Sequence, residues 1–408
     1  MNARETGPSA AFRRSPFAVP MAVAGAWGAY TTSLMDRMAG IHDPAEAARI
    51  AMDDAAARRQ VLKEAVRPSR MLPYPDVEPV ASWPSGDLLW AGGPEGAGAD
   101  EVPELIVPPQ GTRLDAVTRM SADGSPMIVG PDGEVRDAYV IRWAVEPPED
   151  ATIDEPLALI ADAIAELGGR VRLTGWSQGG WMSFIHAALH PETVARLTLA
   201  GTPVDFHAGG PWPSTTKIIA QMSYLPWVRP VADMMVTPVG AVLRTALVND
   251  VWRLYDPVGE AGRVAAAMLD PDEGLRDVTT FTATAPMTPP QYNWFLQHLL
   301  RGNELARGVL EIGGEVIDAS RITCPVHLIV GAEDGVVEPG QGLATEQVLA
   351  DAGSPAEVTS EVFPVGHMSL FGAGALPGDG AVEVGKLFEG ELGEADGEGD
   401  GAAVSPSS

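Results

Sequence analysis

The sequence predicts an α/β protein with a mostly parallel central sheet and helices on both faces. From residue 104 onward, short apolar runs alternate with stretches whose apolar residues recur at helical spacing. Strands that alternate with helices pair in parallel, and the helices then cover both faces of the sheet. The expected strands lie within the runs ELIVPP, DAYVIRWAV, RVRLTG, VARLTLAG, CPVHLIVG and EVTSEVF.

Two helices are expected between these strands. The run EPLALIADAIAELGG places Leu157, Ile160 and Ile164 on one face, and Gly168 marks its end. The second helix covers 177–189 and follows directly on RVRLTG. A strand that runs without a spacer into a helix forms a sharp turn.

The pattern divides the chain into four regions. Residues 1–101 are expected to be helical or irregular, and 102–205 together with 291–376 form the α/β core. Between 206 and 290 the alternation fails and tryptophan, methionine and proline are frequent, which is typical of a helical cap inserted over the sheet. Residues 377–408 are acidic and rich in glycine, so a disordered tail is expected.

Within the first region, residues 41–66 are rich in alanine and charge and predict a helix. Asp43 supplies its cap, with Pro44 in the first turn. Proline and glycine dominate the following stretch, apart from a short candidate strand at 87–90.

Residues 15–34 carry no charge and follow Arg13 and Arg14. Three interpretations stay open: a helix packed on the body, an export signal of the twin-arginine kind, and a membrane span. The helical spacing of its apolar residues favours the packed helix, because the prolines and glycines of the stretch would interrupt a span.

Charge and cysteine content exclude several functions. The formal net charge is −28, from 27 basic and 55 acidic residues, and such a field repels nucleic-acid backbones. Cys324 is the single cysteine, so neither an internal disulfide nor a cysteine metal cluster can form. A single cysteine suits a reducing compartment, and a cytoplasmic location is expected.

The stretch LTGWSQGGW contains the candidate nucleophile, Ser177. Gly175 and Gly179 flank it, and the motif G-x-S-x-G stands between an expected strand and an expected helix. A serine on such a turn needs small neighbours because its backbone is strained and the two elements converge. The alternative is an idle serine in a glycine-rich turn, which the flanking strand and helix argue against.

A serine nucleophile needs a base and an acid that orients the base. In the α/β-hydrolase fold these partners follow the serine in the order acid and then histidine, each after a late strand. Asp334 and His367 occupy those loops. Glu333 and Asp205 are the competing acids, whereas the other histidines considered lie within expected helices or strands and are assigned structural roles: His186, His190, His298 and His327.

An oxyanion hole requires two backbone N–H donors. The N–H of Gln178, directly after the nucleophile, is the first candidate. The second is expected in the loop after the early strand, where two prolines have no N–H, so Gln110 or Gly111 is the first donor available. This chemistry requires neither a metal nor a cofactor.

Together these motifs resemble the polyhydroxyalkanoate synthases and their intracellular depolymerase relatives. The resemblance is densest in LTGWSQGGW, in LTLAGTPVDF, in the run from FLQHLLRGNEL to GAEDGVVEP, and in VGHMSLFG. It implies an α/β-hydrolase fold with catalytic residues at Ser177, Asp334 and His367. The chain departs from the family in having serine where the synthases typically have cysteine, and in carrying Gly111, Thr112 and Arg113 after the double proline.

A serine ester is the usual intermediate of hydrolysis, so the sequence favours a carboxylic-ester hydrolase that acts on hydroxyalkanoate esters or polyester. The alternatives are a synthase-like acyltransferase that uses 3-hydroxyacyl-coenzyme A, and a scaffold without catalysis at a granule. The partner is expected to be a small or oligomeric acyl ester, with a lipid or polyester granule surface as a further candidate. Residues 206–252 of the cap are expected to line the pocket and to select apolar acyl chains.

Overall fold

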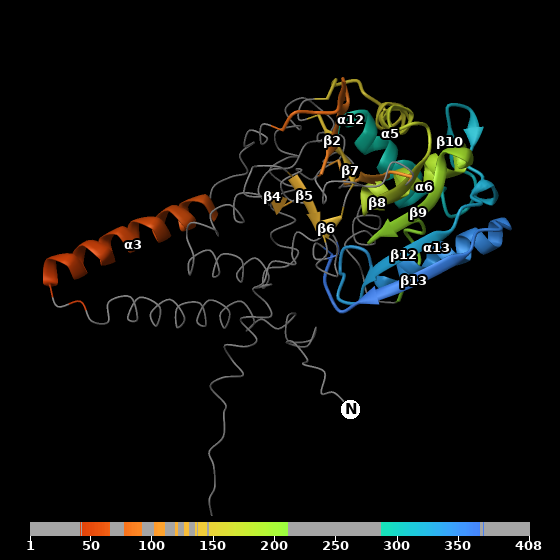
Figure 1. Ribbon diagram of the computed structural model, residues 1–408. Coiled ribbons are helices and arrows are strands. Elements are labelled where there is room, and N and C mark those ends of the chain that lie inside the picture. The colour runs from red at the N-terminus through yellow and green to blue at the C-terminus, as the bar shows by residue number, and fades with distance from the viewer. Residues whose placement is uncertain are drawn as a thin grey trace, which may run out of the picture.

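The computed structural model describes residues 41, 43–65, 77–91, 102–110, 119–120, 126–129, 135–136, 138–144, 147–210, 287–367 and 370 (Figure 1). The uncharged stretch 15–34 and the acidic tail 377–408 lie outside these residues, and so does nearly all of the expected cap. No helix in the described part of the chain is long and apolar enough to cross a membrane.

One eight-stranded sheet forms the centre of the molecule (Figure 1). All pairs from β7 onward in its order are parallel, and only the two pairs that involve β2 are antiparallel. The mostly parallel sheet predicted from the alternating pattern is therefore confirmed. The order is β1 (Ala81–Trp83), β2 (Gly86–Trp90), β7 (Tyr139–Trp143), β3 (Glu104–Val107), β8 (Val171–Trp176), β9 (Val194–Ala200), β12 (Val326–Gly331) and β13 (Val358–Phe363).

Strands β3 and β7 have exchanged places relative to their order along the chain, so β3 lies between β7 and β8. This order, with the serine turn after β8, is that of the α/β-hydrolase fold. The exchange brings the loop after β3 next to the end of β8, because the carboxyl ends of parallel strands meet at one edge of the sheet.

The core sheet begins earlier than predicted. Residues 1–101 were expected to lie outside the α/β core, but β1 and β2 form an antiparallel pair on its edge. The short strand expected at 87–90 is the end of β2. Arg142 of β7 and Asp87 of β2 make an ion pair of 2.8 Å between Nη2 and Oδ2, so the hairpin is held by side chains as well as by the ladder.

The two helices predicted within the core are present as α5 (Asp154–Glu166) and α6 (Gln178–Leu189), and the N-terminal helix is α3 (Pro44–Ala65). Thr288 caps α12 (Pro289–Trp294), which continues as the π-helix η2 (Phe295–Arg301), and α13 (Pro339–Ala352) joins β12 to β13. Two 3₁₀ turns follow α6 and precede β12: η1 (Pro191–Thr193) and η3 (Ala319–Arg321).

Two small sheets were not predicted. One is a hairpin of β10 (Glu311–Ile312) and β11 (Glu315–Val316), and the other contains β4 (Arg119–Met120), β5 (Pro126–Val129) and β6 (Val135–Arg136). Their strands are too short to show the periodicity by which a strand is recognised in a sequence.

The apolar core has two layers, one on each face of the sheet. Leu105 and Leu173 face the larger cluster, which includes Trp181 and Phe184 of α6 and also receives side chains from α5, η2 and α13. Ile106, next to Leu105, faces the smaller cluster. The alternation arises because successive side chains of a strand point to opposite faces. The described helices of the core all contribute to the first face, so the prediction of helices on the second face is not tested by these residues.

His186 lies inside this core and has the structural role expected from its position in α6. It is 3% exposed, and its Nε2 lies 3.0 Å from Thr193 Oγ1, whose own proton is donated to the carbonyl of His190. Burial, with a smaller contribution from the neighbouring His190, lowers the pKa of His186 from 6.5 to about 3. At a pH between about 3 and 6.5, the His186 imidazole is therefore protonated in the unfolded chain and neutral in the folded protein.

We expect this difference to make the protein less stable as the pH falls below about 6.5. The free energy of unfolding should decrease by up to about 1.4 kcal/mol per pH unit from this one group. Denaturant unfolding of the unaltered protein and of His186→Leu between pH 7 and pH 4.5 measures the effect. The variant should have the shallower pH dependence, and parallel curves for the two proteins would contradict the assignment.

Candidate active site

Ser177 occupies the turn between β8 and α6. Its φ of 50° and ψ of −113° lie where residues other than glycine rarely occur. Its backbone N–H donates to the carbonyl of Ala200 at the end of β9, at 2.8 Å. The strained turn predicted from G-x-S-x-G is therefore present, and it places the hydroxyl at the edge of the sheet rather than within the core.

The glycines around Ser177 are required by close backbone contact. A Cβ on Gly179 would overlap the carbonyl oxygen of Val107, and a Cβ on Gly175 would overlap the Cα of Gly180. A Cβ on Gly180 would overlap the side chain of Thr202. Strand β3, strand β8 and helix α6 thus meet with no room for a methyl group, as expected for Gly175 and Gly179.

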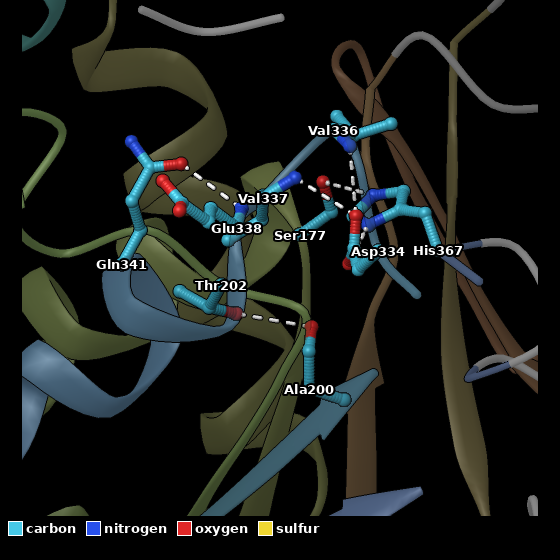
Figure 2. A network of polar contacts seen from close by, with 9 residues as sticks. All are labelled: Ser177, Ala200, Thr202, Asp334, Val336, Val337, Glu338, Gln341 and His367. Carbon is cyan, nitrogen blue, oxygen red and sulfur yellow. Dashed lines mark hydrogen bonds and ion pairs between the residues drawn. The ribbon is translucent and has the colours of Figure 1, made fainter. Parts of the chain in front are cut away.

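Ser177, His367 and Asp334 form one hydrogen-bonded chain (Figure 2). The Ser177 hydroxyl lies 3.0 Å from His367 Nε2, and His367 Nδ1 lies 2.6 Å from Asp334 Oδ2. Each residue comes from a different turn at the carboxyl edge of the sheet, after β8, β12 and β13. The histidine and the aspartate are each 5% exposed, so their contact is shielded from water.

The carboxylate of Asp334 is held by backbone donors on its other oxygen. Oδ1 accepts the N–H of Val336 at 2.9 Å and the N–H of Val337 at 2.8 Å (Figure 2). With both oxygens engaged, Oδ2 can only face His367. The Nδ1 proton is thereby fixed on the aspartate side of the ring, and Nε2 is left to accept the proton of Ser177.

The competing acids lie elsewhere. Asp205 is part of a structural network, because its Oδ1 accepts from the backbone of His207 and Ala208 and from Asn303 Nδ2. Glu333 is exposed and its backbone N–H donates to Val365. The carboxylate that contacts the histidine is therefore that of Asp334.

The other histidines considered in the sequence also lie away from the serine. His298 contacts Glu304 at 2.6 Å, and His327 contacts Thr359 across β12 and β13. His186 and His190 lie at the far end of α6, with their ring centroids 5.0 Å apart.

The described residues include two of the three candidate oxyanion donors, Gln178 and Gln110. Gln178 is the first residue of α6, so its N–H has no partner four residues earlier in the helix. The N–H of Gln110, the predicted second donor, donates to Gln178 Oε1 at 3.1 Å in this structure, so its role as an oxyanion donor stays a prediction. The side chain of Gln178, which follows the candidate nucleophile, is the acceptor that occupies this N–H. The other candidate, Gly111, lies outside the described residues.

Two residues of the site were missed at the sequence level. Gly201, at φ 52°, passes so close to the base that a Cβ there would lie 3.1 Å from His367 Cε1. Gln291 contacts the loop after β3 from α12. A glycine directly after an apolar strand was a usable signal for the first, whereas nothing local indicates the second. In the part of the chain that the structure describes, no group of three histidine, cysteine or acidic side chains could hold a metal ion.

Several curated proteins are similar in sequence to this chain. A poly(3-hydroxyalkanoate) polymerase subunit PhaC of Allochromatium vinosum is 28% identical over 310 residues, which cover 72% of this chain and 82% of the relative. The same subunit of Thiocystis violacea is 26% identical, over 62% of this chain and 71% of the relative. This chain is similar in sequence to poly(3-hydroxyalkanoate) polymerase subunits. The resemblance expected from the sequence is thus confirmed, although no family model matches the chain.

The solved structures to which this chain aligns include a phospholipase and a lipase. A membrane phospholipase A is 14% identical with a TM-score of 0.40, over 88% of this chain and 97% of that one. A monoacylglycerol lipase of Paleococcus ferrophilus is 13% identical with a TM-score of 0.39, over 69% and 90% of the two chains. Such distant matches carry no argument about substrate, and the fold assignment rests on the strand order and the serine turn.

The contact between Gly179 and Val107 can be tested by one methyl group. We expect Gly179→Ala to lower the free energy of unfolding by about 3 kcal/mol, because a backbone carbonyl cannot move aside as a side chain can. The matched control is Gly353→Ala, where φ is 75° and nothing lies within 4 Å of the added Cβ, so only backbone strain of about 1 kcal/mol is expected. Equal losses in the two variants, measured by denaturant unfolding, would show that the predicted overlap is relieved at little cost.

Proposed function

We propose that this chain is a synthase-like acyltransferase that transfers 3-hydroxyacyl groups through Ser177. The observation that carries acyl transfer is the hydrogen-bonded chain from Ser177 through His367 to Asp334. The class of acyl group is inferred from the curated relatives, whose names describe poly(3-hydroxyalkanoate) polymerase subunits. These relatives favour transfer over the hydrolysis that the sequence placed first.

The first half of the reaction forms an acyl-serine. His367 Nε2 takes the hydroxyl proton while Ser177 Oγ bonds to the acyl carbonyl carbon, and the negative charge that develops on the carbonyl oxygen faces the N–H of Gln178. Collapse of this intermediate breaks the bond to the leaving group. His367 returns its proton to that group, which leaves as a thiol from a thioester or as an alcohol from an ester.

The second half regenerates the serine. An acceptor hydroxyl gives its proton to His367 and attacks the acyl-serine carbonyl, and Ser177 leaves with the proton that His367 returns. Asp334 stabilises the imidazolium in both halves because its carboxylate lies against Nδ1. With the hydroxyl of a hydroxyacyl chain as acceptor the product is an elongated ester, and with water it is a free acid.

Ester hydrolysis is the second candidate, and the identity of the nucleophile favours it. Transfer from a thioester to a serine hydroxyl yields an oxygen ester, which is a more stable intermediate than a thioester on cysteine. An acyl-serine is the usual intermediate of ester hydrolysis, so a serine at this position favours hydrolysis. The intact triad argues against the third alternative, a scaffold without catalysis.

Two substrates separate transfer from hydrolysis. With 3-hydroxybutyryl-coenzyme A, the proposal expects release of coenzyme A together with oligomeric or polymeric ester. Release of coenzyme A with only free 3-hydroxybutyrate, together with cleavage of short p-nitrophenyl esters, would show a hydrolase. Ser177→Ala should abolish both reactions and also labelling by a fluorophosphonate probe, because the probe bonds to the activated hydroxyl. Labelling that survives this substitution would place the nucleophile elsewhere.

The role of Asp334 is tested by an isosteric amide. In Asp334→Asn one oxygen can still accept the N–H groups of Val336 and Val337, which turns the amide NH₂ toward His367. The ring is then driven to carry its proton on Nε2 and cannot accept the proton of Ser177. We expect kcat to fall about 10³- to 10⁴-fold with the fold intact. The exposed neighbour provides the control, since Glu333→Gln should leave kcat within about twofold. Equal effects in the two variants would contradict the assignment.

A further inference from the structure

Three glutamine side chains form a hydrogen-bonded chain beside Ser177, and none of these side chains takes part in the acyl-transfer steps. Gln110 ends the described part of the loop after β3, Gln178 begins α6, and Gln291 lies in α12. Gln110 and Gln291 are 7% and 1% exposed. A buried side-chain amide is costly unless its donors and acceptor are paired, so their contacts need a structural explanation.

The hydrogen bonds link the three glutamines in sequence, from Gln178 through Gln110 to Gln291. Gln110 and Gln178 form two reciprocal hydrogen bonds. The Gln110 backbone N–H donates to Gln178 Oε1 at 3.1 Å, and Gln178 Nε2 donates to Gln110 Oε1 at 3.0 Å. Gln110 Nε2 then donates to Gln291 Oε1 at 3.4 Å, and Gln291 Nε2 donates to the carbonyl of Thr152 at 2.9 Å.

The two ends of the chain determine the orientation of all three amides. A backbone N–H can only donate and a backbone carbonyl can only accept, so each glutamine between them must accept on one side and donate on the other. Such a chain has a single arrangement. The position of Gln291 therefore fixes the position of Gln110 in the loop after β3.

Gln291 itself is fixed by the start of α12. Its backbone N–H donates to Thr288 Oγ1, and its Oε1 accepts the N–H of Thr288, which is a capping box. Thr288 is tied in turn to the carbonyl of Ala151. The neighbouring Met287 contacts the same cluster, because its sulfur lies 3.4 Å from Gln178 Nε2.

We propose that Gln291 is a positioning residue for acyl transfer. Through Gln110 it holds the loop after β3 against the first turn of α6, beside the Ser177 hydroxyl and the Gln178 N–H. The role rests on the proposed function, because it is defined by the reaction at Ser177. Earlier in the described part of this loop, Trp143 Nε1 donates to the carbonyl of Pro108 at 2.8 Å, and the contact with Gln291 holds the loop again at Gln110.

Removal of the Gln291 amide leaves Gln110 Nε2 buried without its acceptor. The loop must then move to satisfy that donor, and a small displacement next to a nucleophile lowers the rate of the chemical step more than the binding of substrate. The expected signature is a lower kcat with KM little changed. A purely structural residue would instead alter stability and leave the kinetics of the folded fraction unaltered.

The test compares Gln291→Leu with Gln291→Glu. The leucine removes every side-chain contact, so kcat for acyl transfer or ester cleavage, and the rate of fluorophosphonate labelling, should fall about tenfold. The glutamate retains the capping box and an acceptor for Gln110 Nε2. Because Gln291 is 1% exposed, the glutamate is expected to be neutral, with its O–H donating to the carbonyl of Thr152 in place of the amide, and it should keep most of the rate. Gln297→Leu is the matched control, because Gln297 is exposed and contacts Asn293.

A double-mutant cycle distinguishes positioning from a general loss of stability. Gln110→Ala keeps the backbone N–H but removes the side chain through which Gln291 acts. In this background Gln291→Leu should cause no further loss of rate, and additive losses would overturn the proposal.

Unchanged or faster labelling of folded Gln291→Leu would also overturn this role, while leaving the proposed function in place. An unaltered protein that the probe does not label at Ser177 would instead overturn the proposed function, and this role with it. If Gln291→Leu does not fold, the comparison of Gln291→Glu with Gln110→Ala decides: rates near the unaltered value in both overturn the proposal.

Discussion

The site depends on the close approach of three backbone segments at the end of β8. Val107 of the neighbouring strand, Gly175 of β8 and Gly179 of α6 meet without space for a methyl group between them. Because nothing separates these segments, the turn at Ser177 is sharp and strained, and its hydroxyl leaves the sheet toward the loops at its carboxyl edge. The glycines are thus the condition under which the other catalytic groups can reach the serine.

The remaining groups are brought to this point by the parallel sheet. Strands β12 and β13 lie side by side, so the loops that follow them carry Asp334 and His367 to the same edge. The orientation of these groups starts from the backbone and passes from one side chain to the next. Two N–H groups hold the carboxylate, and the carboxylate holds the ring. Such preorganisation means that little rearrangement is needed when charge develops during acyl transfer.

The proposed chemistry combines sequence similarity to poly(3-hydroxyalkanoate) polymerase subunits with a serine, Ser177, as the nucleophile. The curated relatives connect it to poly(3-hydroxyalkanoate) polymerase subunits, whereas an oxygen ester on Ser177 resists onward transfer more than a thioester would. The balance between chain growth and hydrolysis then depends on how well water is kept from the acyl-serine. It also depends on how firmly the loop after β3 is held beside the serine, for which the glutamine chain ending at Gln291 offers a physical basis.

The sequence by itself determined the parallel sheet and the places of Ser177, Asp334 and His367, because each depends on local patterns: alternating apolar runs, a glycine-flanked serine, and polar residues directly after strands. Only the tertiary structure decided which acid faces the histidine, that β1 and β2 join the core sheet, and that the Gln110 N–H is already occupied. These features depend on contacts between residues far apart in the chain. Gln291 lies 181 positions from Gln110, and no local periodicity or motif encodes such a distance.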